Sequence, residues 1–389
     1  MGAHWFECER CGSRVPVYNS CNDRHCPLCQ GGKRAEWLQK RTDELLPVEY
    51  FQVVFTAPEQ LTALAQAQPE VFYEALMQAV KDTLLEVAAS PEHLGAQLGG
   101  VMVLHTWGQM LQLHPHVHVI VPGGGLRTGT GSDQDDRCLS PSSPSGSDQD
   151  DRSPSSQPEA EWVSCPAGFF LPVRVLSEVF RGKLLDSLKR THQAGELRLT
   201  GGLAQLADAD QFCAWLATCY ETGWVVYVEP PRDRAPAQAL KYMARYVYRV
   251  AISNDRFESL EDGQITFRYK DYARGGVWRS TTLSADEFLR RFLQHVVPPH
   301  FVRIRSFGFL ASCHRERKLA LIRRLLGVQA SASACVTPSD EDPDGGPVQA
   351  TPRCPYCGHH VLRPVGSTTR PSRRQLQALL RPLPLLDGL

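Results

Sequence analysis

The sequence lacks an excess of charge of either sign. Its 42 Lys and Arg residues are balanced by 42 Asp and Glu residues, which gives a formal net charge of zero at pH 7. A chain coated in basic charge is therefore excluded, and a nucleic-acid partner would have to bind at a local basic patch. With 42% hydrophobic residues over 389 positions, the chain can bury a sizeable core in two or three domains.

Long apolar segments are also missing. No run of about 18 apolar residues occurs, so we expect no membrane-spanning helix. The N-terminal residues MGAHWFEC lack the charged and apolar regions of a secretory signal peptide. We therefore expect a cytoplasmic protein whose 13 cysteines stay reduced, and clustered cysteines in such a protein usually bind metal.

Composition divides the chain into three predicted parts. Residues 1–45 are rich in Cys and His, residues 46–310 carry strand and helix patterns, and residues 311–389 form a basic C-terminal region. Residues 127–160 interrupt the middle part with Ser, Pro, Gly, Asp and Gln, and contain the heptapeptide GSDQDDR twice. Because so little of this insert can be buried, we expect a disordered polar surface loop.

The segment LHPHVHVIV, residues 113–121, predicts a β-strand that carries a metal site. Side chains alternate along a strand, so His114, His116 and His118 share one face while the valines that follow point to the other. Imidazole is a common metal ligand, and two imidazoles at i and i+2 can hold one cation with little ordering cost. A half-exposed strand that is merely rich in histidine is the competing interpretation.

A third ligand for this cation is expected from the preceding strand. If residues 101–107 and 116–122 form a hairpin, His105 lies across from His118 and shares its face. His105 is therefore the leading candidate beside His116 and His118, and His114 takes a supporting role. The alternative third ligands are Gln109 and His114. The cation is expected to be Mg²⁺ or Mn²⁺, and imidazole ligands favour Mn²⁺.

Two Cys-x-x-Cys pairs near the N-terminus predict a structural zinc site. They are separated by 14 residues, a spacing that suits one tetrahedral Zn²⁺ ion. The predicted ligands are Cys8, Cys11, Cys26 and Cys29. Cys21 and His25 lie between the pairs, and either can replace one ligand or contribute to a second site. A domain of about 45 residues cannot be stabilised by burial alone, so its folding should require the ion.

One further pair, Cys354 and Cys357, lies in the C-terminal region and is followed by His359 and His360. These residues could nominally supply enough ligands for a second Zn²⁺ ion. A single Cys-x-x-Cys is a weaker signal than two, and the sequence leaves open whether this pair binds metal.

Residues 240–249, LKYMARYVYR, predict a helix that carries a pair of tyrosines. Tyr242 and Tyr246 are four residues apart and share one helical face. An aromatic stripe buried in a core is the competing interpretation. The flanking cations favour a phosphate-rich substrate instead. They are Lys241, Arg245 and Arg249. A tyrosine that attacks a metal-bound phosphate leaves a covalent phosphotyrosine intermediate.

The sequence resembles the two-tyrosine HUH transposases of the insertion sequence ninety-one type, which are rolling-circle transposases. The resemblance is carried by residues 11–30, 105–126, 241–257 and 302–310. The HUH motif falls on His116, Val117 and His118, and the paired tyrosines of the family fall on Tyr242 and Tyr246. The insert at 127–160 departs from the pattern.

The resemblance implies an α+β fold in which an antiparallel-sheet nuclease core with packed helices follows a small zinc-binding domain. It also implies a strand transferase that nicks single-stranded DNA at the ends of a mobile element. The products would be a 5′-phosphotyrosine link and a 3′-hydroxyl. The implied partners are single-stranded DNA, transposon-end DNA and host replication proteins, in the nucleoid of a bacterial cytoplasm and with no membrane.

A basic run that includes Arg303 and Arg305 is the predicted DNA-binding region, together with the cations around the tyrosines. A solvated charged surface is the competing interpretation. Two other functions stay open from the sequence. One is a zinc-ribbon DNA-binding protein whose nuclease has decayed, and the other is a metal-dependent phosphodiesterase in which water attacks and the tyrosines only pack.

Overall fold

The computed structural model describes residues 2–19, 21, 23–26, 30, 37, 41–42, 44–128, 160–229, 247–328, 357 and 362–368. The chain divides into two compact units. The larger unit comprises residues 37–247 and 256–336, and the smaller comprises residues 1–36, 248–255 and 337–389. Most of the predicted polar insert and the predicted tyrosine helix lie outside the described residues.

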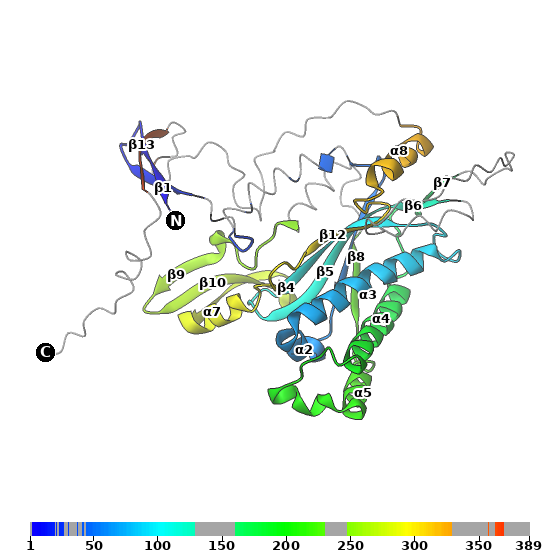
Figure 1. Cartoon of the computed structure of the whole chain (residues 1–389). Helices are drawn as coiled ribbons and strands as arrows, with labels where there is room; N and C mark the ends of the chain where they lie inside the picture. The colour runs from blue at the N-terminus through cyan, green and yellow to red at the C-terminus, as the bar shows by residue number, and fades with distance from the viewer. Residues whose placement is uncertain are drawn as a thin grey trace, which may run out of the picture. The chain divides into compact units, whose positions relative to one another are not determined.

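A five-stranded antiparallel sheet forms the centre of the larger unit (Figure 1). The strand order is β12-β4-β5-β3-β8. The bounds are Tyr50–Thr56 for β3, Gly99–Trp107 for β4, Leu113–Pro122 for β5, Val225–Glu229 for β8 and Ile304–Gly308 for β12. Each neighbouring pair is antiparallel. The predicted α+β class is confirmed.

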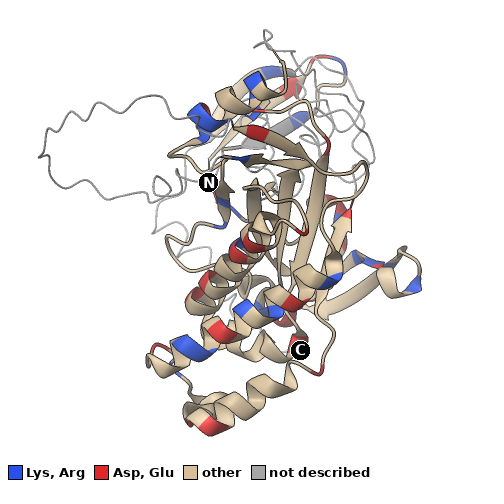
Figure 2. Ribbon diagram, turned by 90° about the vertical axis from the view of Figure 1, so that its right-hand side faces the viewer, with Lys and Arg blue, Asp and Glu red and all other residues tan. Residues whose placement is uncertain are grey.

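Helices cover one face of this sheet (Figure 1). They are α2 (Thr62–Ala67), α3 (Pro69–Ala89), α4 (Val173–Gln193) and α5 (Ala209–Thr218), with short 3-10 turns at Glu59–Leu61 and Gly201–Ala207. Pro69 occupies the first turn of α3, where the missing N–H costs no hydrogen bond. Figure 2 shows basic and acidic positions interspersed along the helices of the larger unit.

The core lies between these helices and the sheet. Val117, Val119 and Val121 of β5 are fully buried in it, and Phe55 of β3 packs edge-on against Phe180 of α4 at 5.1 Å between ring centroids. Burying one such valine stabilises the fold by about 1.5–3 kcal/mol. The predicted alternation along residues 113–121 is confirmed, because the side chains between these valines point to the opposite face.

The described part of the larger unit also contains two smaller sheets and two further helices. One sheet pairs β6 (Gly124–Arg127) with β7 (Glu161–Ser164), and α8 (Arg315–Leu325) packs nearby through Leu319 and Ile322. The other has the order β11-β10-β9 and is followed by α7 (Ala285–Leu293). Its strands are β9 (Phe257–Glu261), β10 (Gln264–Asp271) and β11 (Val277–Ser284), with a 3-10 turn at Tyr272–Arg274. Another 3-10 turn, Asn254–Arg256, spans the boundary between the two units in the sequence.

The smaller unit contains a three-stranded antiparallel sheet built from both ends of the chain. Its order is β13-β1-β2, with β1 at Ala3–Cys8, β2 at Arg14–Tyr18 and β13 at Leu362–Thr368. The register of β1 and β13 runs from Ala3 opposite Thr368 to Cys8 opposite Leu362. Across the described part of both units, no helix is long and apolar enough to cross a membrane.

Candidate metal centre

Three histidines meet on the face of the central sheet opposite α2, α3, α4 and α5. The possible ligand atoms of His105, His116 and His118 all lie within 4.8 Å of one another. The ring centroids of His105 and His118 are 4.6 Å apart, and those of His116 and His118 are 5.0 Å apart. Three imidazoles at this separation can converge on one divalent cation.

The strand register differs from the expected one. His105 lies opposite His116, and Val103 takes the predicted place opposite His118. The pairing shifts between His105 and Trp107, and Leu111 in the turn has a left-handed backbone with φ of 61°. The expected pairing was wrong by two residues because such irregularities are not visible as hydrophobic periodicity. A shift of two keeps every side chain on its face, so His105 still joins the other two histidines.

Backbone and side-chain contacts orient the imidazoles. Nδ1 of His116 lies 2.7 Å from the backbone carbonyl of His114. A carbonyl only accepts, so this nitrogen carries the proton and Nε2 presents its lone pair to a metal. His114 itself is exposed, and its carbonyl thus fixes the neighbouring ligand. The surrounding protein lowers the pKa of His114 by desolvation, while the negative charge of Glu59 acts in the opposite direction.

Gln52 contacts His118, the second histidine of β5 in the cluster, and is not among the site residues predicted from the sequence. The nitrogen of its amide lies 2.7 Å from Nδ1 of His118, Gln52 is only 6% exposed, and the amide oxygen is buried without a hydrogen-bond partner among the described residues. A 180° rotation of the amide exchanges its nitrogen and oxygen and places the oxygen at His118. When the amide oxygen faces His118, it accepts the Nδ1 proton and leaves Nε2 for the metal. The available signal was a single polar residue inside the apolar strand YFQVVFT.

His105 is held by stacking. It is 1% exposed and its ring lies 4.6 Å from that of Trp107 in a stacked arrangement. Trp107 in turn contacts His295 edge-on. Nδ1 of the buried His295 lies 3.2 Å from the Thr106 hydroxyl oxygen, and its Nε2 lies 3.1 Å from the Leu111 carbonyl oxygen. These contacts fix the strand on which His105 lies.

The tip of the β4–β5 hairpin is bound by the neighbouring sheet and by α7. Arg256 donates to the backbone carbonyl of Gln109, and the Lys270 N–H lies 3.4 Å from the Gln109 side-chain oxygen. Arg291 of α7 donates to the Met110 carbonyl at 3.2 Å. The amide oxygen of Gln109, an alternative third ligand in the sequence, therefore contacts Lys270.

The predicted nucleophiles Tyr242 and Tyr246 lie outside the described residues, as do Lys241 and Arg245. The next residue in the chain, Val247, is described and is 1% exposed. Its carbonyl accepts a hydrogen bond of 3.3 Å from the buried guanidinium of Arg303. The backbone carbonyl of Arg303 accepts from the N–H of Leu104 at 2.9 Å. Arg303 thus connects the end of the tyrosine segment to the strand that carries His105.

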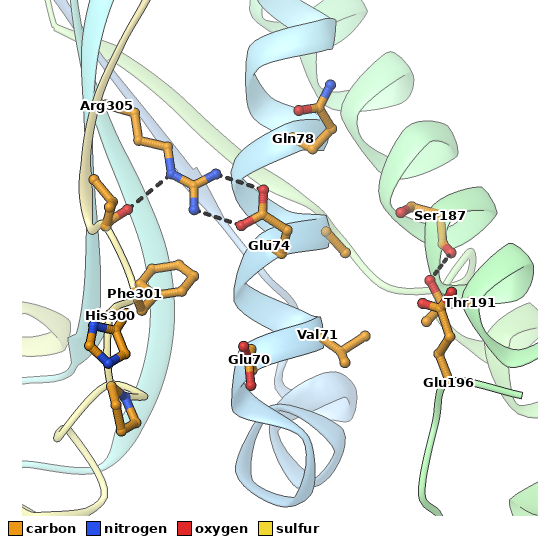
Figure 3. A pocket seen from close by; sticks show the side chains of 13 residues that line it. Glu70, Val71, Glu74, Gln78, Ser187, Thr191, Glu196, His300, Phe301 and Arg305 are labelled. Atoms are coloured by element: carbon orange, nitrogen blue, oxygen red, sulfur yellow. Dashed lines mark hydrogen bonds and ion pairs between the residues drawn. The ribbon is translucent and has the colours of Figure 1, made fainter. Parts of the chain in front are cut away.

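The other two predicted DNA-binding arginines have different surroundings. Arg249 is exposed. Arg305 forms a two-pronged ion pair with Glu74 of α3 at 2.6 and 2.7 Å, inside a pocket of about 570 Å³ (Figure 3). This hydrogen bonding lowers the pKa of the Glu74 carboxyl. Arg305 is paired with Met102, whose side chain belongs to the helix-covered core, so it faces away from the histidines.

The cysteines at the two ends of the chain also come together. The sulfur atoms of Cys8, Cys11 and Cys357 lie within 4.8 Å of one another. Cys21, His25 and Cys26 are described but do not join this group, and Cys29 and Cys354 lie outside the described residues.

Comparison with known proteins identifies the class. A family model described as "Putative transposase" matches residues 99–142 and 155–318, together more than half of the chain. A model described as a transposase zinc-binding domain matches residues 1–57. The interval between the two matched stretches of the first model falls inside the polar insert. The chain is therefore a transposase, which is a DNA-processing enzyme, with an N-terminal zinc-binding domain.

Two relatives narrow the class. The "Putative transposase y4qJ" of Sinorhizobium fredii is 44% identical over 332 residues, which cover 85% of this chain and 76% of the relative. The transposase for insertion sequence element IS801 of Pseudomonas savastanoi pv. phaseolicola is 26% identical over 326 residues, which cover 80% of this chain and 67% of the relative. The chain belongs to the transposases of the insertion sequence ninety-one type. No solved structure gives a significant match.

Proposed function

We propose that this transposase nicks single-stranded DNA at the ends of its element and links the 5′ end to Tyr242 or Tyr246. His105, His116 and His118 would bind the Mg²⁺ or Mn²⁺ ion that this chemistry requires. The observation that carries the proposal is the histidine cluster, in which possible ligand atoms of all three imidazoles lie within 4.8 Å of one another and two of the three residues are buried. Three neutral nitrogen ligands favour Mn²⁺ over Mg²⁺.

The reaction exchanges one phosphodiester for another. The phenolic oxygen forms a bond to phosphorus, the bond from phosphorus to the 3′ oxygen breaks, and that oxygen takes up a proton to become a 3′-hydroxyl. A phenol has a pKa near 10, so its attack at neutral pH needs help. A bound divalent cation makes the phosphorus more electrophilic and stabilises the developing charge. A 3′-hydroxyl can later attack the phosphotyrosine and release the phenol, which joins strands without ATP.

Arg303 supports the placement of a tyrosine at this centre. Tyr246 precedes Val247 by one residue, and Arg303 joins Val247 to the residue beside His105. We assign Arg303 to this positioning role, because its guanidinium is buried. The exposed Arg249 is kept as a phosphate contact.

A second surface, on β10 and β11, is suited to binding single-stranded DNA. Between β10 and β11, the Arg268 guanidinium lies 5.7 Å from the ring centre of Trp278. Lys270 of β10 lies 5.6 Å from the ring centre of Tyr272, which begins the 3-10 turn after this strand. Both rings are accessible, with Trp278 46% and Tyr272 65% exposed. Aromatic rings beside cations bind single strands by base stacking and phosphate attraction. Because Lys270 also contacts the tip of the histidine hairpin, we propose that DNA crosses this surface on its way to the metal.

The decisive experiment is detection of the covalent adduct. The chain is incubated with labelled single-stranded DNA of the element end and Mn²⁺, and run on a denaturing protein gel. We expect a labelled adduct that the Tyr242→Phe/Tyr246→Phe double variant does not form, whereas Tyr220→Phe, an exposed tyrosine on another part of the unit, serves as the control and forms it normally.

Other results would select other functions. Cleavage without an adduct would identify a phosphodiesterase that uses water. DNA binding with neither cleavage nor adduct would identify a DNA-binding protein whose nuclease has decayed. The two single variants show whether the tyrosines are equivalent.

A further inference from the structure

We propose that the two ends of the chain share one zinc ion, bound by Cys8 and Cys11 from the N-terminus and by Cys354 and Cys357 from the C-terminal region. The sequence alone grouped Cys8 and Cys11 with Cys26 and Cys29. The shared site changes that ligand set and makes the zinc-binding domain depend on residues beyond the matched stretch 1–57.

The distances between the sulfur atoms fit a tetrahedral zinc site. Cys8 Sγ and Cys357 Sγ are 3.5 Å apart, although the residues are separated by 349 positions in the sequence. Cys11 joins them so that all three sulfur atoms lie within 4.8 Å of one another. Zn–S bonds of about 2.3 Å in a tetrahedron place sulfur atoms about 3.8 Å apart. Three thiolates so placed need one more ligand.

The backbone supports the shared site independently of the sulfur positions. β1 ends at Cys8, and its partner strand β13 begins at Leu362 directly opposite. The hydrogen-bonded ladder thus holds the two cysteine segments at the same end of one small sheet. Such a sheet has too little core to be stable alone, and an ion at its end would close it.

The local sequence and turn geometry support grouping the Cys-x-x-Cys pair at 8 and 11 with the pair at 354 and 357. After Cys8 the chain turns tightly, since the Gly12 N–H donates to the Cys8 carbonyl at 2.8 Å and Gly12 has a φ of 68° that favours glycine. The sequence CERCG at 8–12 has the same Cys-x-x-Cys-Gly pattern as CPYCG at 354–358. The pair at 26 and 29 is followed by Gln30 instead. Cys354 lies outside the described residues, and we assign it as the fourth ligand because it is the other half of the Cys-x-x-Cys pair of Cys357, whose sulfur atom is in the group.

Zinc counting on the full chain tests the shared site. The measurements use a His116→Ala/His118→Ala background, so that the histidine cluster adds no zinc to the count. We expect Cys8→Ser/Cys11→Ser and Cys354→Ser/Cys357→Ser each to lose one zinc per chain, and the fourfold variant to lose the same one and no more. Cys213→Ser, an exposed cysteine on α5, is the matched control and keeps its zinc.

Two results would overturn the shared site. One is full zinc content in Cys354→Ser/Cys357→Ser, and the other is a loss of two zinc ions in the fourfold variant. A measurement on the unaltered cysteines covers the case of variants that misfold. After zinc is removed by a chelator, mild oxidation should link Cys357 to Cys8 or Cys11, and peptide mass spectrometry should find the cross-linked ends. If Cys357 is linked to neither, the proposal fails. These readouts are independent of DNA nicking.

Discussion

Replacing Gln52 by leucine tests how the metal centre is built. Gln52 is buried and contacts the Nδ1 atom of His118, which is itself only 8% exposed. Leucine keeps the volume and removes the polar contact. His118 then loses the group that fixes its ring and its tautomer, while His105 and His116 keep theirs. We expect the Mn²⁺ affinity to fall by about 10–100-fold, the usual effect of losing such a supporting contact, which corresponds to about 1.4–2.7 kcal/mol.

The same change leaves a buried ring nitrogen without its Gln52 contact. This should lower the free energy of unfolding by about 1–3 kcal/mol. Gln52→Glu should retain Mn²⁺ binding, because a carboxylate can accept the Nδ1 proton. Isothermal titration with Mn²⁺ and urea unfolding of the same samples separate the two effects. Gln66→Leu, an exposed glutamine on α2, is the matched control. Mn²⁺ affinity of Gln52→Leu within twofold of the parent would refute the role assigned to Gln52.

Three further predictions follow from the described residues. His105→Ala should weaken Mn²⁺ binding by about tenfold or more, since a direct ligand matters at least as much as a supporting contact, and unchanged titration would remove His105 from the site. Trp278→Ala should reduce the affinity for single-stranded DNA by about 1–3 kcal/mol in a fluorescence anisotropy titration, and an unaltered affinity would count against the β10–β11 surface. An alanine in the left-handed backbone conformation costs about 1–2 kcal/mol. Gly308→Ala should lower the free energy of unfolding by more than this, because its Cβ would lie 1.7 Å from the Leu98 carbonyl oxygen. Gly263→Ala, which shares the left-handed backbone but has open space, is the control in urea unfolding, and equal losses would show that the clash is relieved at no cost.

The histidine strand could be predicted because its signal is local. Strand periodicity alone separates the buried valines from the histidines, and this separation is found in the structure. The exact partner of His105 could not be predicted, since the pairing depends on the irregularity before Trp107. Gln52 was missed because a polar residue in an apolar strand gives no sign of what it contacts across 66 positions.

The cysteine grouping shows the limit of spacing rules more clearly. Cys8, Cys11, Cys26 and Cys29 form a familiar pattern, and proximity in sequence made their grouping the natural expectation. Cys357 joins Cys8 and Cys11 through a strand pair between the chain ends, and no local pattern encodes such a pair. Arg305 illustrates the same point for charge, because its partner Glu74 is 231 residues away.

The pairing of β1 with β13 also sets the order in which the protein matures. Ribosomes add about 5–20 residues per second, so about 20–70 s separate the synthesis of Cys8 from that of Cys357, 349 residues later. During that interval β1 has no β13 to pair with, while most of the larger unit is already complete. A transposase truncated before β13 would carry the histidine centre without the third strand of its N-terminal sheet. Closure of this sheet therefore has to wait until the residues of β13 have been synthesised.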